Sequence, residues 1–299
     1  MLDHRSGLLL AIGFFSAACS QPVIPPSSKP DNVVPTLEAT VESLPSDTAV
    51  PASAPTPTVD RNCQETAGQM IRAELVDPEL PRSLPYRVYI PPCAEDAHGK
   101  LPSLYLLHGL ARTDAQWDEI GADEVAQELV IDGRAPPFLI VMPWERLGLE
   151  YEQTVVEYLI PHIESEYGAS PDRDLRSIGG ISRGAGWALR VGLQHPELFT
   201  AIGLHSPAVL VPDIFMIPDW IEAIPEEAMP EIWIDIGDRD SLRFSLPELI
   251  GLFKEADVPY AYRSYPGEHI ETYWADHVED YIRWYVSGWL DLELGDPPQ

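Results

Sequence analysis

From Cys63 onward, short apolar runs alternate with longer segments whose apolar residues recur at helical spacing. The apolar runs have the length and flanking turn residues of buried strands, and they lie at 86–90, 103–107, 138–142, 177–181, 201–204, 232–236 and 260–265. Helical spacing covers 123–132, 152–167, 184–194, 245–256 and 271–290. This alternation predicts an α/β fold in which helices cover both faces of a mostly parallel sheet.

Two of the helical segments carry further information. Pro161 lies inside the segment 152–167 and is expected to kink or split it, because proline lacks the backbone N–H that a helix needs. The last segment bears an aromatic stripe, which predicts the face that packs on the sheet rather than a ligand site; it consists of Trp274, Val278, Tyr281, Ile282, Tyr285 and Trp289.

The first 60 residues do not share this pattern. Residues 1–19 combine Arg5, a short apolar run and small residues before Cys19, which is typical of an export signal. Cys19 resembles the lipid-attachment cysteine of bacterial lipoproteins, although Ser16 stands where leucine is usual. Ordinary signal-peptide cleavage, giving a secreted protein, is the alternative.

Residues 20–60 are expected to form a disordered tether. Nine prolines fall between positions 21 and 60, and such a stretch cannot bury enough apolar surface to offset its ordering entropy. Residues 61–299 then form one domain, exported and facing the extracytoplasmic side, held to the membrane only through the lipid anchor.

The charge narrows the possible partners. The chain has 299 residues and a net charge of −29, and the first 60 residues hold only two basic and six acidic side chains. The acidity therefore belongs mainly to the domain, and it argues against nucleic acid or an anionic membrane surface as a partner.

Cysteine usage agrees with export. If Cys19 is lipidated or removed, Cys63 and Cys93 remain, and they form either a disulfide or two free thiols. Neither has the spacing of a metal ligand, so no metal site is predicted.

The sequence Gly180-Ile181-Ser182-Arg183-Gly184 lies between a predicted strand and a predicted helix. A G-x-S-x-G pattern in this context is typical of a nucleophile elbow, a tight turn that exposes a serine hydroxyl. Its glycines allow neighbouring backbone to approach closely. Ser182 is the predicted nucleophile; an ordinary glycine-rich loop is the alternative.

A serine hydroxyl needs a base to remove its proton and a carboxylate to orient that base. On this fold both follow the serine on loops after later strands, which selects His269 as base and Asp240 as acid. Asp235 and Asp238 are the competing carboxylates. The competing histidines, His195, His205 and His277, lack the expected loop position.

An oxyanion hole completes such a site. One donor is expected from the backbone N–H of Arg183, which follows the nucleophile, and the other from the backbone N–H of Leu110, in the loop after the strand 103–107. His108 is expected to be structural. Trp117 either packs in the core or lines an acyl pocket.

These motifs together resemble the esterase-D-type esterase family of α/β hydrolases. The resemblance rests on residues 105–110 (YLLHGL), 156–167 (VEYLIPHIESEY), 172–184 (DRDLRSIGGISRG) and the loops that carry Asp240 and His269. It implies Ser182, Asp240 and His269 as the catalytic residues and the Leu110 and Arg183 N–H groups as oxyanion donors. Arg183-Gly184-Ala185 departs from the Met-Gly-Gly of many members.

The expected function is that of a serine esterase that hydrolyses a small-molecule carboxylic ester, with no cofactor and no metal. An acyltransferase using the same residues and a non-catalytic binding protein on the same scaffold are the alternatives. Neither the acyl nor the alcohol part of the substrate, nor the oligomeric state, can be read from these residues.

Overall fold

A computed structural model of the chain describes residues 65–94 and 101–293, with side chains as far as residue 290. All of these residues belong to one compact unit. The predicted boundaries at residues 19 and 60 lie outside the described residues, as do Cys19 and Cys63, so those predictions stay predictions.

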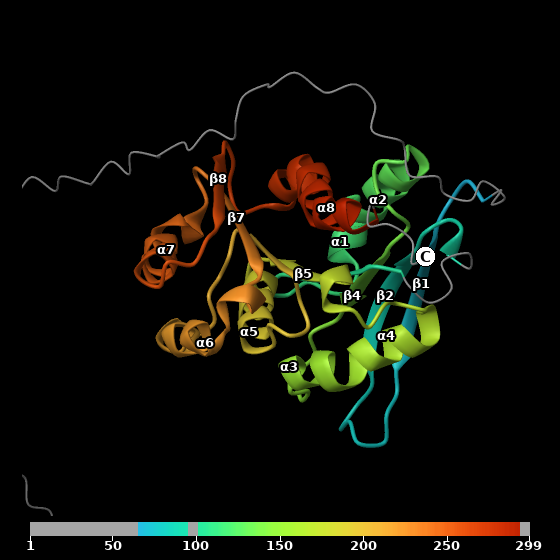
Figure 1. Cartoon of the computed structure of the whole chain (residues 1–299), viewed down its shortest axis with the longest axis horizontal. Coiled ribbons are helices and arrows are strands. Elements are labelled where there is room, and N and C mark those ends of the chain that lie inside the picture. The colour runs from blue at the N-terminus through green and yellow to red at the C-terminus, as the bar shows by residue number, and fades with distance from the viewer. Residues whose placement is uncertain (1–64, 95–100, 294–299) are drawn as a thin grey trace, which may run out of the picture. The chain divides into compact units, whose positions relative to one another are not determined.

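Eight strands form one sheet in the order β1-β2-β4-β3-β5-β6-β7-β8 (Figure 1). The two edge-side strands β1 and β2 pair antiparallel, β2 also pairs antiparallel with β4, and every later pairing is parallel. The strands are β1 Gln69–Leu75, β2 Leu84–Ile90, β3 Ser103–Leu107, β4 Leu139–Pro143, β5 Arg176–Ile181, β6 Ala201–His205, β7 Glu231–Gly237 and β8 Ala261–Tyr265. The predicted α/β class is confirmed.

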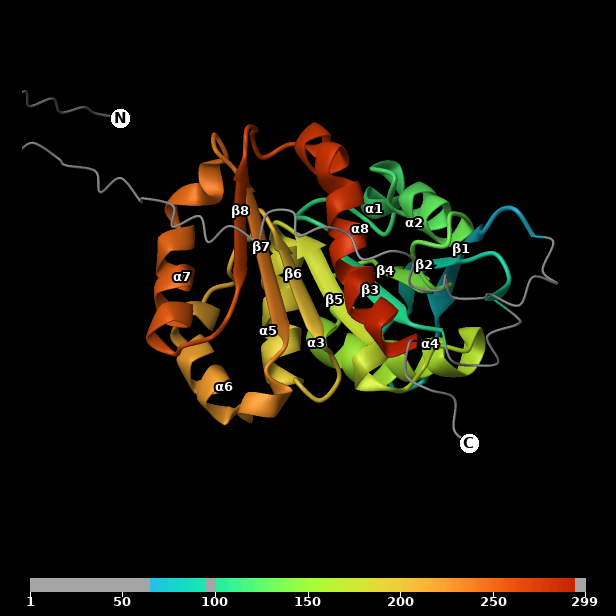
Figure 2. The ribbon, with the colours of Figure 1, turned by 45° about the horizontal axis from the view of Figure 1, so that its top comes forward.

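Helices cover both faces of this sheet (Figures 1 and 2). One face carries α1 Gln116–Glu119, α2 Ala122–Ile131 and α8 Glu271–Glu293. The other carries α3 Tyr151–Gln153, a π-helical segment Thr154–Leu159, α4 Ile160–Tyr167, α5 Arg183–Gln194, α6 Ile217–Ala223 and α7 Leu246–Glu255. Short 3-10 helices lie at Arg173–Leu175, Asp213–Phe215, Glu226–Ala228 and Ser241–Phe244.

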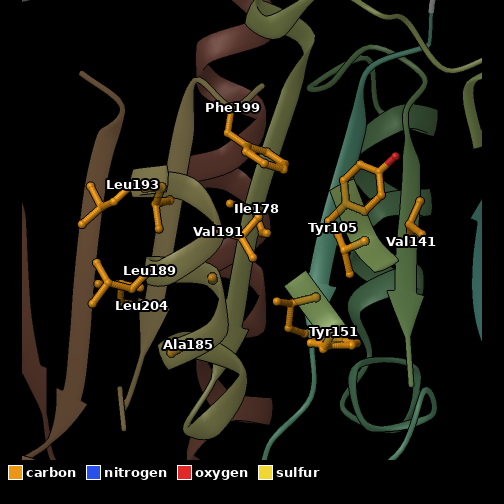
Figure 3. Packing of buried hydrophobic residues seen from close by; sticks show 14 of the residues in the cluster. Tyr105, Val141, Tyr151, Ile178, Ala185, Leu189, Val191, Leu193, Phe199 and Leu204 are labelled. Atoms are coloured by element: carbon orange, nitrogen blue, oxygen red, sulfur yellow. The ribbon is translucent and has the colours of Figure 1, made fainter. Parts of the chain in front are cut away.

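The central strands feed two separate hydrophobic cores because successive side chains point to opposite faces. In β3, Leu104 and Leu106 pack with α2 and α8, whereas Tyr105 and Leu107 pack with α4 and α5. Figure 3 shows Tyr105 in the second core, together with Leu189 of α5. The predicted aromatic stripe of α8 is buried in the first core, so its interpretation as a packing face is confirmed.

Besides the short 3-10 helices, one described strand and two described α-helices were not predicted. β1 has a mixed pattern of exposed and half-buried residues because it is an edge strand, so its sequence shows no apolar run. α1 and α6 span four and seven residues, too few for a helical period to be recognised.

The segment 152–167, which Pro161 was expected to kink or split, is divided into α3, a π-helical segment and α4 without a break in the helical structure. Helical structure continues from Tyr151 to Tyr167, with a π-helical segment just before Pro161, which lies in the first turn of α4. A π-helical turn rearranges the backbone hydrogen bonds, and the first turn of a helix tolerates a residue without an N–H.

Candidate active site

Ser182 lies between the end of β5 and the start of α5, where the chain reverses direction. Ser182 has a φ of 56° and a ψ of −115°, a backbone conformation that residues other than glycine rarely adopt. Its N–H donates to the carbonyl of His205 at 2.9 Å, and its carbonyl accepts from the N–H groups of Gly186 and Ala208. The elbow is therefore held from both sides, and Ser182 itself is half-buried.

The two glycines of the motif are required by close backbone contacts. A β-carbon on Gly180 would lie 2.3 Å from the carbonyl carbon of Gly184, and one on Gly184 would lie 2.1 Å from the carbonyl oxygen of Leu107. Any larger residue at either position would push the helix away from the sheet. The steric reason expected for the G-x-S-x-G pattern is present in the structure.

The three residues predicted as nucleophile, base and acid form one hydrogen-bonded chain. Nε2 of His269 lies 2.9 Å from Oγ of Ser182, and Nδ1 of the same ring lies 2.8 Å from Oδ2 of Asp240. When Nδ1–H donates to the carboxylate, Nε2 presents its lone pair to the serine hydroxyl. Loops after three different strands, β5, β7 and β8, bring these side chains together.

Asp240 is fully buried, yet it stays ionised. Burial alone would raise its pKa, but hydrogen bonds from His269, the Leu242 N–H and Ser206, with the charge of the imidazole, together lower the pKa below its ordinary value. The Leu242 N–H donates to Oδ1 at 2.7 Å, so each carboxylate oxygen is engaged. Such a group can orient an imidazole and stabilise its charged form.

The neighbouring Asp238 has a different position. Its Oδ1 accepts from the Gly267 N–H at 3.0 Å, and backbone bonds join Asp238 to Tyr265 and Arg239 to Gly267. These contacts tie the loop that carries Asp240 to the loop that carries His269. Asp238 therefore contacts the Gly267 N–H and the Arg239 side chain rather than the base, and its link between the two loops was not predicted.

The predicted oxyanion donors lie beside the serine. A β-carbon on Gly109 would be 3.6 Å from Cβ of Ser182, which places the Leu110 loop next to the nucleophile. Within the described ranges, no hydrogen bond uses the N–H of Leu110 or of Arg183. Both groups remain available to a ligand, and their role as donors stays a prediction.

The other histidines considered as the base, and Trp117, lie elsewhere. His195 pairs with Glu152 at the end of α5, and His277 contacts the Tyr273 carbonyl within α8. Trp117 is buried, and its Nε1–H donates to the Leu107 carbonyl at 3.0 Å. It belongs to the core, so the alternative of an acyl-pocket wall is wrong.

Asp235 and His205 pair with each other instead of with the serine. Both are fully buried, and His205 Nδ1 lies 2.6 Å from Asp235 Oδ1. The hydroxyls of Tyr273 and Tyr281 donate to the other carboxylate oxygen. This cluster lies in the core of the α8 face of the sheet.

Cys93 takes part in a disulfide. Its predicted partner, Cys63, lies outside the described residues, so the pairing stays a prediction. In the part of the chain that the structure describes, no cluster of three or more histidine, cysteine or acidic side chains could hold a metal ion. Across those same residues, no helix has the length and apolar character needed to span a membrane.

The fold and the hydrogen-bonded serine, histidine and aspartate define an α/β hydrolase with the site of a serine esterase. The chain belongs to the family described as "Putative esterase", whose model matches residues 78–285. The family match and the geometry of the site support a serine carboxylic-ester hydrolase, in agreement with the resemblance seen in the sequence.

Several known proteins are similar to this chain. An endo-1,4-beta-xylanase/feruloyl esterase from Xylanibacter ruminicola is 26% identical over 155 residues, which is 48% of this chain and 20% of that protein. The structure of a ferulic acid esterase has a TM-score of 0.66 at 25% identity, covering 74% of this chain and 99% of the other. An S-formylglutathione hydrolase from Staphylococcus aureus shares the fold, with a TM-score of 0.60 at 18% identity and coverage of 73% and 99%.

Proposed function

We propose that this protein hydrolyses carboxylic esters through an acyl-enzyme formed on Ser182. One observation carries the proposal: the ring of His269 bridges Ser182 and Asp240 through hydrogen bonds of 2.9 and 2.8 Å. A base so placed can take the serine proton as the hydroxyl attacks, while the buried carboxylate stabilises the imidazolium that forms.

In the first step Ser182 Oγ bonds to the ester carbonyl carbon, and His269 Nε2 receives the hydroxyl proton. The tetrahedral intermediate collapses by breaking the carbon–oxygen bond to the alcohol, which leaves with the proton from His269. Water then attacks the carbonyl carbon of the acyl-enzyme and gives a proton to His269 Nε2. The bond to Ser182 Oγ breaks, the serine oxygen regains the proton, and the acid is released. The N–H groups of Leu110 and Arg183 stabilise the negative oxygen in both halves.

The direct test uses the full chain with p-nitrophenyl acetate, butyrate and octanoate. Ser182→Ala should abolish hydrolysis and labelling by a fluorophosphonate, whereas Ser287→Ala, at an exposed serine of α8, should retain both. If the wild type neither hydrolyses these esters nor is labelled, the protein is a binding protein on a hydrolase scaffold. Preferential transfer of the acyl group to an added alcohol over water would instead indicate an acyltransferase.

For the substrate, we propose an ester of an aromatic carboxylic acid. Ferulic acid esterases recur among the similar proteins, one of them the Anaeromyces mucronatus enzyme in complex with ferulic acid, at 19% identity, a TM-score of 0.60 and coverage of 79% and 97%. Large apolar side chains are also exposed on the loops and short 3-10 helices that follow the parallel strands, at the sheet edge that carries Ser182; they are Leu110, Leu147, Val211, Phe215, Phe244 and Ile270. Such side chains suit an apolar acyl group better than an anionic peptide thioester.

Methyl ferulate and S-formylglutathione distinguish the two possibilities. The net charge of −29 repels an anionic substrate, so kcat/KM for methyl ferulate should exceed that for S-formylglutathione at low ionic strength. The reverse order, persisting at high salt, contradicts an aromatic ester as substrate while leaving the serine mechanism in place.

We also propose that the protein is exported and anchored by a lipid on Cys19. The basis is the sequence of residues 1–19 together with the cysteine at their end. Cys19→Ser should move the protein from the membrane fraction to the medium or periplasm of an expressing bacterium. If wild type and variant are equally soluble, ordinary signal-peptide cleavage is favoured.

A further inference from the structure

Glu145 lies two residues beyond the end of β4 and was not singled out in the sequence. Its carboxylate accepts from Nε of Arg183 at 3.0 and 2.8 Å and from Nη2 at 2.6 Å. A guanidinium joined to both oxygens of a carboxylate is the geometrically most restrictive ion pair that two side chains form. Because Arg183 is the first residue of α5, this pair fastens the loop after β4 to the helix of the nucleophile elbow.

The same residue also holds His108 through its main chain. The Glu145 N–H donates to His108 Nε2 at 2.8 Å, and His108 Nδ1 lies 2.8 Å from the carbonyl oxygen of Gly109. A carbonyl only accepts, so Nδ1 carries the hydrogen and the ring is neutral. Burial lowers the pKa of His108, which agrees with a neutral ring.

The Gly109 carbonyl belongs to the same peptide unit as the Leu110 N–H. Because that unit is planar and trans, a hydrogen bond that fixes the carbonyl also fixes the direction of the N–H. Gly109 does not restrict this orientation by itself, since it has no side chain. Two further bonds assist: the Arg112 N–H donates to the Gly109 carbonyl at 3.1 Å, and the Gly109 N–H donates to Gln116 Oε1 at 2.7 Å.

A continuous series of contacts therefore runs from one expected oxyanion donor to the other. It begins at Arg183, passes through the carboxylate and the N–H of Glu145, then through the ring of His108, and ends at the peptide that contains the Leu110 N–H. We propose that Glu145 is a positioning residue that sets the distance and direction between the two oxyanion donors. This inference rests on the proposed esterase function, because it concerns the donors of that reaction.

The ion pair has a second consequence for the same reaction. Glu145 is an anion close to the place where negative charge develops, and the Arg183 guanidinium neutralises it. Removing Arg183 alone leaves both a loosened loop and an uncompensated anion. Replacing Glu145 by glutamine in the same protein removes the uncompensated anion, so the double variant should lose no more activity than Arg183→Met.

The test compares Arg183→Met, Glu145→Gln and their double variant with Arg190→Met in the full chain. Arg183→Met keeps the backbone N–H donor and loses the ion pair with Glu145 and the contact of the guanidinium with the Trp187 ring. Arg190 is the matched control, because it lies on the same helix, pairs with Asp213 and also stacks on Trp187. The measurements are kcat/KM for p-nitrophenyl acetate, inhibition by phenylboronic acid, which forms a tetrahedral adduct on the serine, and Tm.

We expect Arg183→Met to lower kcat/KM about tenfold, less than the loss of a whole donor, which costs about a hundredfold or more. Inhibition by phenylboronic acid should weaken by the same factor, because the adduct depends on the same donors. Arg190→Met should retain kcat/KM while its Tm falls by an amount similar to that of Arg183→Met.

Two results would overturn the inference. The first is kcat/KM and boronate inhibition within twofold of wild type in both Arg183→Met and Glu145→Gln. The second is an equal loss of activity in Arg183→Met and Arg190→Met, in step with Tm, which would make the pair a fold-stabilising contact only. Failure of the esterase proposal is distinguishable, because then the wild type itself neither hydrolyses the ester nor is labelled at Ser182.

Discussion

The described part of the chain contains two hydrogen-bonded aspartate–histidine pairs. They differ in the partner of the second ring nitrogen and in the exposure of the imidazole ring. In both, the Nδ1 atom of the ring faces a buried carboxylate, at 2.8 Å for His269 and Asp240 and at 2.6 Å for His205 and Asp235. His269 uses its other nitrogen to contact Ser182, whereas His205 uses it to contact the Tyr285 hydroxyl at 3.1 Å. The His269 side chain is 26% exposed and that of His205 is fully buried.

The difference shows what makes such a pair reactive. The His205 pair lies at the carboxyl ends of β6 and β7, where the hydroxyls of Tyr273, Tyr281 and Tyr285 satisfy the remaining polar atoms. Burial raises the pKa of Tyr281 far above its ordinary value, with the Asp235 charge adding to the shift, so this hydroxyl remains a donor. No substrate atom can reach that ring. The His269 pair lies on loops, and its second nitrogen faces an accessible nucleophile.

The largest expected effect separates the two histidines by activity. His269→Ala should lower kcat/KM by about a millionfold, equivalent to about 8 kcal/mol, because the serine loses its base. Its Tm should stay near that of wild type, since the ring is partly exposed. His205→Ala should do the opposite, with a large fall in Tm and retained kcat/KM for the folded protein at low temperature. Equal losses of activity in the two variants contradict the distinction.

The two aspartates of the loop after β7 should also differ in their effect on activity. Asp240→Asn should lower kcat/KM by about ten-thousandfold, because an amide no longer holds the imidazole in the required tautomer and no longer stabilises its charge. Asp238→Asn is the matched comparison, since its amide oxygen can still accept from the Gly267 N–H. It should lose less than about tenfold, the effect of a weakened neutral hydrogen bond. A larger loss in Asp238→Asn would transfer the role of acid to Asp238.

Removing the buried carboxylate of Asp235 should lower the stability of the fold more than the catalytic activity. Asp235→Ala leaves His205 and the hydroxyls of Tyr273 and Tyr281 without their shared acceptor, so the free energy of unfolding should fall by about 3–5 kcal/mol. Urea unfolding measures this fall. Asp219→Ala, at an exposed carboxylate of α6, is the control and should change it by less than about 0.5 kcal/mol. An equal, small change in both variants would show that the buried cluster does not stabilise the fold.

The same contrast explains what the sequence could predict. Ser182, Asp240 and His269 lie within four residues of the ends of predicted strands, and the motif around Ser182 fixes the order in which acid and base must follow. The position of Asp235 in the sequence is informative too, because a carboxylate inside an apolar strand requires buried hydrogen-bond partners. Those partners come from α8 and the end of β6, so only the folded chain identifies them.

The role of Glu145 could not be predicted from the sequence, for a different reason. Glu145 follows β4 as Asp240 follows β7, but no motif distinguishes it from other acidic residues in a chain this acidic. Its contacts with Arg183 and His108 depend on the lateral order of the strands, in which β4 lies beside β3, and β3 beside β5. Strand order is a property of the whole sheet, and local sequence carries little information about it.

The smallest expected effect concerns acid stability. The hydrogen bonds and charge around Asp240 lower its pKa below the ordinary 3.8, so its ionised form stabilises the folded state. That contribution is fully present above pH 3.8, where the carboxylate is ionised folded or unfolded, and it is lost as pH falls through the folded-state pKa. Below pH 3.8 the wild type should therefore lose free energy of unfolding faster than Asp240→Asn, which has no carboxylate to protonate there. Urea unfolding at a series of pH values measures the two slopes, with Asp219→Asn as the control for an exposed carboxylate. Parallel slopes for the wild type and Asp240→Asn would mean that the contacts of Asp240 do not favour its charged form in the folded protein, contrary to the environment described for the reactive pair.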